Sequence, residues 1–195
     1  MVSPKSLPAE FDRGLVTTVH QGDCLVAAEG DVTFSTVLGS CISACIRDVK
    51  ARVGGMNHFL LAEPSELARD RYGASARYGA FAMERLINGV LSRGTGRKAN
   101  LEIKVFGGGL INASMSDIGG KNVAFVRQFL ADEGYAAAAE DLGGTVARRV
   151  LFKPHSGRVF VKRLAPDEGD SVARQELAIA GRGQQRPVVD DIELF

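Results

Sequence analysis

A cysteine in a glycine-containing bend is the residue of this sequence best suited to nucleophilic chemistry. Cys41 follows Leu38-Gly39-Ser40 and lies between two runs of β-branched and small residues that are typical of strands. Glycine lets a backbone turn tightly, and such a bend can aim neighbouring N–H groups into one concavity. A concavity of that kind suits the oxyanion of an acyl-transfer reaction. We therefore consider Cys41 a candidate nucleophile.

His58 is the candidate base for this thiol. It lies on the next predicted strand, behind Gly54-Gly55. A free thiol has a pKa of about 8.5, so only a few per cent is thiolate near neutrality, and a paired imidazole lowers that pKa. Neighbouring strands allow His58 to lie beside Cys41, although the spacing does not require it. The alternative is a small buried cysteine and a structural histidine, and the residues alone leave both interpretations open.

The remaining cysteines and histidines suggest neither a disulfide framework nor a metal centre. Three cysteines, Cys24, Cys41 and Cys45, are too few and odd in number for a framework and fit a reducing compartment. We interpret Cys24 and Cys45 as packing residues. Zinc needs four ligands, and the three histidines form no ligand pair along the chain. We expect no metal site.

Composition narrows the class of protein. The net charge is +1, and basic residues are interleaved with acids rather than clustered, which argues against nucleic acid as the main partner. Residues 1–10 lack the apolar core of a signal peptide, and no apolar run approaches the length that spans a bilayer. We expect a soluble cytoplasmic protein without membrane insertion.

Hydrophobic periodicity predicts strands interrupted by two helices. The predicted helices cover residues 76–93 and 122–133, where apolar residues recur at helical spacing. The predicted strands cover residues 14–28, with a turn at Gly22-Asp23, and 32–38, 41–46, 56–61, 101–106, 136–142, 146–153 and 158–164. This order predicts an α/β (α+β) fold, a single layered domain in which a mixed β-sheet packs with about two main helices.

Domain bounds follow from the same reading. We expect a flexible lead over residues 1–13, the folded domain over 14–164 and a flexible C-terminal tail over 165–195.

Two glycine clusters, Gly107-Gly108-Gly109 and Gly119-Gly120, lack the residues of a phosphate-binding loop. We interpret both clusters as turns.

Longer motifs resemble one family, the chemoreceptor glutamine deamidases called CheD. The resemblance spans about residues 14–164, in order and with matching spacing. It rests on Thr36-Val-Leu-Gly-Ser-Cys41, Ile42-Ser-Ala-Cys45-Ile-Arg-Asp48, Gly54-Gly-Met-Asn-His-Phe-Leu-Leu61, Arg77-Tyr-Gly79, Ala82-Met-Glu84, Leu86-Ile-Asn88, Lys104-Val-Phe-Gly-Gly108, Ile118-Gly119, Asn122-Val123, Asp141-Leu-Gly-Gly144 and Arg148-Arg149.

The resemblance implies a set of catalytic residues. The family nucleophile falls on Cys41 and the general base on His58. A third family residue, a threonine six positions before the cysteine, falls on Ser35, which keeps the hydroxyl but departs from the pattern. The neighbouring Thr36 takes that role only if the backbone is shifted. Backbone N–H groups of Ser40 and Cys41 are the expected oxyanion donors.

The resemblance also implies an activity and its partners. The expected reaction converts glutamine side chains of methyl-accepting chemotaxis receptors into glutamate through a cysteine thioester, with release of ammonia and no cofactor. The alternative is a regulatory adaptor that binds a CheC-type chemotaxis phosphatase with little catalysis. A further alternative is a thiol hydrolase that acts on another protein amide.

Overall fold

The computed structural model describes residues 11, 14–61, 74–110 and 117–165 of the 195. The flexible lead predicted for residues 1–13 lies outside this range except for Phe11 and so does the tail predicted for 165–195 except for its first residue. Among the helices in the described ranges, none has the length and apolarity needed to cross a membrane.

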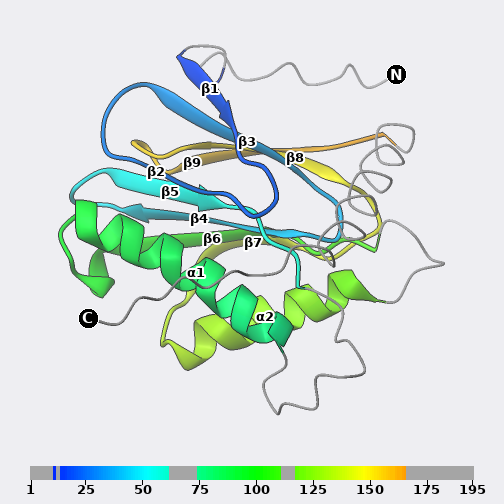
Figure 1. Ribbon diagram of the computed structural model, residues 1–195. Coiled ribbons are helices and arrows are strands. Elements are labelled where there is room, and N and C mark those ends of the chain that lie inside the picture. Colours follow the sequence, from blue (N-terminus) through cyan, green and yellow to red (C-terminus); the bar gives the residue numbers. More distant parts are fainter. Residues whose placement is uncertain (1–10, 12–13, 62–73, 111–116, 166–195) are drawn as a thin grey trace, which may run out of the picture.

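Within the described residues the chain forms two sheets and two α-helices (Figure 1). The four-stranded sheet has the order β1-β3-β8-β9, and the five-stranded sheet has the order β2-β5-β4-β6-β7. The strands are β1 Leu15–Thr18, β2 Cys24–Ala27, β3 Val32–Leu38, β4 Ile42–Asp48, β5 Val53–Asn57, β6 Leu101–Gly107, β7 Ala137–Leu142, β8 Arg148–Lys153 and β9 Arg158–Arg163. The helices are α1 Ala74–Arg93, α2 Ile118–Asp132 and a short 3-10 helix at Lys98–Asn100.

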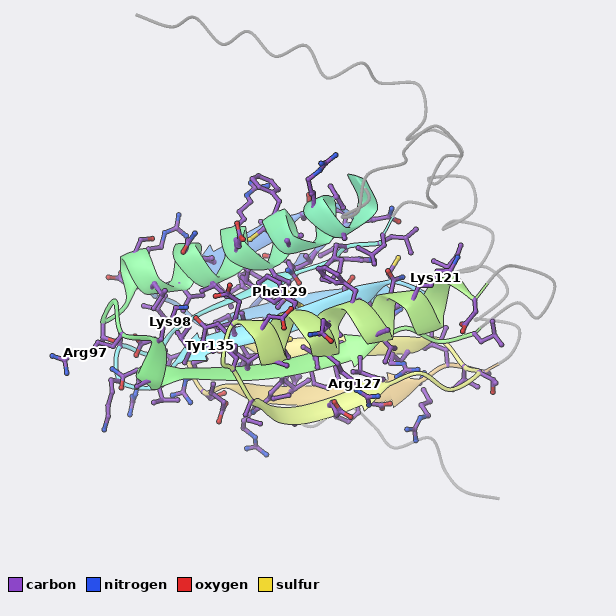
Figure 2. All side chains as sticks on the ribbon, turned by 90° about the horizontal axis from the view of Figure 1, so that it is seen from below. Arg97, Lys98, Lys121, Arg127, Phe129 and Tyr135 are labelled. Atoms are coloured by element: carbon purple, nitrogen blue, oxygen red, sulfur yellow. The ribbon has the colours of Figure 1, made fainter. Side chains whose placement is uncertain are left out.

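The layers are stacked as sheet, sheet and helices. Helices α1 and α2 lie side by side on the outer face of the five-stranded sheet, and the four-stranded sheet covers its other face (Figures 1 and 2). The five-stranded sheet is therefore the middle layer, buried on both faces at its centre. Every residue of β5 is buried, and so are all but one of β4. The sequence of a strand that is buried on both faces is typically a nearly continuous run of apolar residues.

Strand β4 divides its side chains between the two cores. Ile42, Ala44 and Ile46 belong to the core under the helices, and Cys41 and Cys45 belong to the core between the sheets. This alternation is the one that the sequence predicts for an extended segment beginning at Cys41. It places Cys41 in the space between the sheets, which is where the four-stranded sheet can reach it.

The helical layer is anchored by aromatic contacts and by a capped start of α2. Phe125 of α2 packs edge-on against Phe59 at a centroid distance of 6.0 Å, and Phe129 lies one turn further on. The Asp117 side chain accepts a hydrogen bond from the Gly120 N–H and caps the helix. The helix therefore begins four residues before the predicted start.

The predicted fold class is confirmed, with one refinement. The α+β layered domain with two main helices is present, and each predicted strand run overlaps an observed strand, although β5 shares only Met56 and Asn57 with the run predicted over residues 56–61. The strands of the described ranges do not form one sheet but divide between two, and among them only β1–β3 and β6–β7 pair in parallel. Periodicity predicts which face of a strand is buried, but it does not identify the strand's neighbours.

Candidate active site

Cys41 and His58 are brought to one face of the middle sheet by antiparallel pairing. Their following residues, Ile42 and Phe59, form a pair in which each backbone N–H donates to the other's carbonyl, both at 2.9 Å. Ile42 and Phe59 face the helices, so the preceding Cys41 and His58 face the other sheet. Side chains placed diagonally on such a pair are within reach of each other. Both Cys41 and His58 are buried.

Thr36 orients the His58 ring from the opposite sheet. Its hydroxyl donates to the Val19 carbonyl at 2.7 Å and lies 2.8 Å from His58 Nδ1. Because the hydroxyl has only one proton, its oxygen accepts a hydrogen bond from Nδ1–H. Nδ1 also lies 3.4 Å from the Val19 carbonyl oxygen, which can only accept. This network assigns the ring proton to Nδ1 and leaves Nε2 as the basic nitrogen of neutral His58.

Ser35 does not occupy the position that the resemblance implies for it. On β3, Thr36 shares a face with Phe34 and Leu38, which lie in the core between the sheets. Ser35 lies on the opposite face of the strand, because successive side chains alternate. The structure therefore brings Thr36, and not Ser35, to His58. No shift of the backbone is needed for this contact.

A loop between β1 and β2 carries Gln21 to the thiol. The Gly22 N–H donates to the His58 carbonyl at 2.7 Å, and the His58 N–H donates to the Asp23 carbonyl at 3.1 Å. These bonds attach the loop to the backbone of the candidate base. Gln21 Oε1 then lies 3.8 Å from Cys41 Sγ, within the range of a weak thiol hydrogen bond. The sequence indicated only a turn here, and no pattern in it marked Gln21.

A small cavity opens beside His58. Its volume is about 130 Å³, below the range of about 300–1,000 Å³ usual for drug-sized ligands. Its lining includes His58 and, from α1, Tyr78, Phe81 and Arg85. Burial raises the pKa of the Tyr78 phenol, and charge on Cys41 raises it further. The cavity fits a single slender side chain better than a cofactor.

The bend that holds Cys41 is fixed through its three carbonyl groups. The Gly39 carbonyl accepts from the Gly109 N–H at 2.7 Å, and the Cys41 carbonyl accepts from the Gly108 N–H at 2.8 Å. The Ser40 carbonyl accepts from the Asn122 side-chain amide at 2.8 Å. The predicted turn at Gly107-Gly108-Gly109 thus supports the bend that holds Cys41. Sequence reasoning missed this role and that of Asn122.

Glycine is required at position 107, where the Gly107-Gly108-Gly109 segment contacts the bend that holds Cys41. Gly107 has a φ of 114°, and a Cβ built on it would lie 2.0 Å from the Cys41 carbonyl oxygen. Any side chain at this position would displace Cys41. The second glycine cluster has a similar function: Gly119 lies inside α2, and a Cβ there would lie 2.7 Å from the carbonyl oxygens of Gly108 and Gly109.

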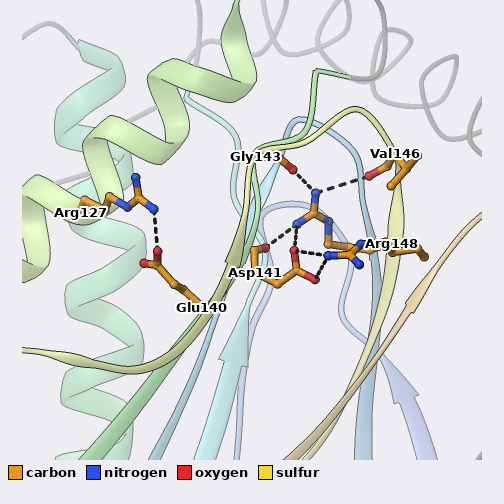
Figure 3. A network of polar contacts seen from close by, with 7 residues as sticks. Arg127, Glu140, Asp141, Gly143, Val146 and Arg148 are labelled. Carbon is orange, nitrogen blue, oxygen red and sulfur yellow. Dashed lines mark hydrogen bonds and ion pairs between the residues drawn. The ribbon is translucent and has the colours of Figure 1, made fainter.

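A buried arginine supports the next loop outward (Figure 3). Arg148, only 1% exposed, donates to the Asp141 carboxylate at 2.7 Å and to the carbonyls of Gly143 and Val146. Burial lowers the pKa of this guanidinium below its usual value, and Asp141 offsets part of that effect. The Gly143 N–H in turn donates to the Gly107 carbonyl at 2.8 Å. Arg148 therefore holds the loop at Gly143, and this loop in turn holds Gly107.

The other cysteines lack the setting of a nucleophile. Burial raises the pKa of the Cys45 thiol far above its ordinary value, and burial also raises that of Cys24. A protonated thiol is a poor nucleophile, so both fit a packing role. Within the described ranges, no three side chains of His, Cys, Asp or Glu lie together as a group that could hold a metal ion.

Together the fold and the site define a class: an α+β protein with a buried cysteine and a histidine whose basic nitrogen is set by a threonine. A family model described as CheD chemotactic sensory transduction matches residues 60–163. A relative from Ruegeria sp. (strain TM1040), named probable chemoreceptor glutamine deamidase CheD 1, is 45% identical over 95% of this chain and 98% of its own length. This chain belongs to the CheD family, as its motifs indicated.

Further relatives carry the same description. One from Caulobacter vibrioides is 47% identical over 84% of this chain and 86% of the relative. One from Hahella chejuensis is 43% identical over 82% of this chain and 76% of the relative. Both are named probable chemoreceptor glutamine deamidase CheD.

Proposed function

We propose that this protein is a protein-glutamine deamidase that converts glutamine side chains of methyl-accepting chemotaxis receptors into glutamate. The domain that carries this activity spans residues 14–164. The observation that carries the proposal is the hydrogen bond between Thr36 and His58 Nδ1, which presents Nε2 as a base on the same face as Cys41. The names of the relatives supply the substrate class.

In the first half of the reaction, His58 Nε2 takes the proton of the Cys41 thiol. The thiolate attacks the carboxamide carbon of the substrate, a carbon–sulfur bond forms, and the carbonyl oxygen becomes an oxyanion. Backbone N–H groups of Ser40 and Cys41 stabilise that charge. The carbon–nitrogen bond then breaks, and ammonia leaves with the proton that His58 returns.

In the second half, water hydrolyses the thioester. His58 Nε2 takes a proton from the water as it attacks the thioester carbon, and the carbon–sulfur bond breaks. His58 then gives that proton to the departing Cys41 sulfur, and the products are glutamate on the substrate and the free Cys41 thiol. The contact between Cys41 Sγ and Gln21 Oε1 supports the proposal, because it places a carboxamide oxygen directly beside the thiol.

Two further features of the site fit a protein substrate. The cavity beside His58 has room for one slender side chain, and the exposed Tyr78 and Phe81 lie at its edge, where a folded partner would make contact. We place the reaction at the cytoplasmic region of the receptor. A CheC-type phosphatase as partner rests on the family resemblance. A purely adaptor role is less favoured, because binding alone does not require an oriented histidine beside a cysteine.

The test is direct mapping of the product. Purified full-length protein is incubated with a receptor cytoplasmic fragment, and glutamine-to-glutamate changes are located by mass spectrometry together with ammonia release. We expect conversion at a small number of defined glutamines. Unchanged glutamines in fragments from the receptors of the same organism would refute the proposed function.

Removal of the Thr36 hydroxyl should reduce turnover. In Thr36→Val the shape of the side chain is retained, but His58 loses the acceptor that holds its ring and tautomer. We expect kcat to fall by about tenfold or more, part of the contribution that a positioned base makes. The matched control is Ser35→Ala, which removes a hydroxyl from the opposite face of the same strand. A larger loss of kcat in folded Ser35→Ala than in Thr36→Val would return the role to Ser35.

A further inference from the structure

Asn122 connects the segment of the nucleophile with the segment of the base. It lies in the first turns of α2 and is fully buried. Its amide nitrogen donates to the Ser40 carbonyl at 2.8 Å, and its Oδ1 accepts from the Leu61 N–H at 3.0 Å. One side chain therefore fixes a residue directly before Cys41 and another just beyond His58.

The hydrogen bond from Asn122 to the Ser40 carbonyl also determines the direction of the Cys41 N–H. A trans peptide unit is planar, so its N–H points opposite to its carbonyl. The Ser40 carbonyl points at Asn122 on the helical side of the sheet, and the Cys41 N–H therefore points away from α2. The Cys41 side chain also lies on that side, in the core between the sheets. A rotation of this one peptide unit would turn the N–H away from the thiol's side.

We propose that Asn122 is a positioning residue for the oxyanion site, which holds the Ser40–Cys41 peptide unit so that the Cys41 N–H faces the developing negative charge. The inference rests on the proposed function. Asn122 does not touch the substrate; it acts through the Ser40 carbonyl. Its effect belongs to the transition state, because the charge that it helps to stabilise exists only after the thiolate has attacked.

The decisive variant is Asn122→Asp. The new carboxylate keeps the size of the side chain and the acceptor for the Leu61 N–H, but it places an oxygen against the Ser40 carbonyl in place of a donor. We expect kcat for ammonia release from a receptor cytoplasmic fragment to fall on the order of 10²–10³-fold, the usual cost of one lost oxyanion donor. We expect KM to stay close to that of the wild type.

Two readouts separate this role from general support of the fold. Alkylation of Cys41 by iodoacetamide needs the thiolate but no oxyanion site, so its rate and its pH profile should match the wild type. Burial raises the pKa of a carboxyl group, and once protonated the new group can donate to Ser40. The ratio of variant kcat to wild-type kcat should therefore rise as the pH is lowered.

A control variant tests the packing of α2 alone. Val126→Ala removes a buried side chain one turn further along the same helix without touching Ser40. It should lower the melting temperature and retain kcat. If Asn122→Asp does not fold, Asn122→Ala gives the same comparison, since it also removes the donor.

The outcomes are distinguishable. A wild-type protein that releases no ammonia overturns the proposed function, and this inference with it. An active wild type with a folded Asn122→Ala variant of near-normal kcat overturns this inference alone, because alanine removes the donor at every pH. Parallel losses of kcat and of Cys41 alkylation would also overturn it, because they would place the defect in the thiol rather than in the oxyanion site.

Discussion

Cys41→Ala is expected to reduce deamidation to background while the protein remains folded. Removal of a covalent nucleophile costs on the order of 10⁶-fold in kcat, because the thioester route is lost altogether. The side chain is small and lies in a core that also contains Leu38 and Met56, so an alanine leaves only a minor cavity. The measurement is ammonia release from a receptor fragment, with circular dichroism to verify the fold.

Cys45→Ala is the matched control for this experiment. Cys45 lies on the same face of β4, in the same core, and is as deeply buried as Cys41. Both variants lose one buried thiol, so a difference between them reports chemistry rather than packing. We expect Cys45→Ala to keep most of its turnover. Comparable turnover in the two variants would end the thiol mechanism.

Arg148→Ala is expected to produce the largest loss of stability. The change leaves Asp141 without its buried partner and removes the donors that hold the carbonyls of Gly143 and Val146. Asp141 is 26% exposed and keeps its contact with Arg163, so we expect the lower end of the cost of breaking a buried pair, about 3 kcal/mol in the free energy of unfolding. For a chain of this size that is a fall of roughly 6–12 °C in melting temperature.

Arg127→Ala supplies the contrast within the same region (Figure 3). Arg127 pairs with Glu140 at 2.6 Å, but their side chains are 57% and 44% exposed. Exposed pairs contribute about 0–1 kcal/mol, so this variant should melt within a few degrees of the wild type. Equal losses in the two variants, measured by thermal and urea unfolding, would show that burial of Arg148 is not what stabilises the loop.

The order of strands and helices could be predicted because most segments carry an uninterrupted apolar pattern. The start of α2 could not, since Gly119 and Gly120 discourage a helix in isolation. Tertiary contact overrides that propensity: Gly119 is the residue that lets the helix approach the carbonyls of Gly108 and Gly109. The two-sheet arrangement was also beyond reach, because strand partners such as β3 and β8 are far apart in sequence.

The placement of the candidate site residues could be predicted where family motifs fix it, but not where the geometry of the fold decides it. Cys41 and His58 fall on the motifs, and antiparallel pairing places them on one face. Ser35 was chosen by counting positions from Cys41, but such a count across the bend at Gly39 does not preserve strand alternation. Gln21 and Asn122 act through contacts across the fold, and neither lies beside Cys41 or His58 in the sequence.

The contact between Thr36 and His58 has a consequence for the newly made chain. Thr36 belongs to the four-stranded sheet, and its strand β3 pairs with β8, where Val150 is the partner of Thr36 and lies far beyond Cys41 and His58 in the sequence. The thiol and the imidazole emerge from the ribosome long before that partner exists. Since domains generally fold as units, we expect the Thr36–His58 contact to form only after β8 has been synthesised and has paired with β3.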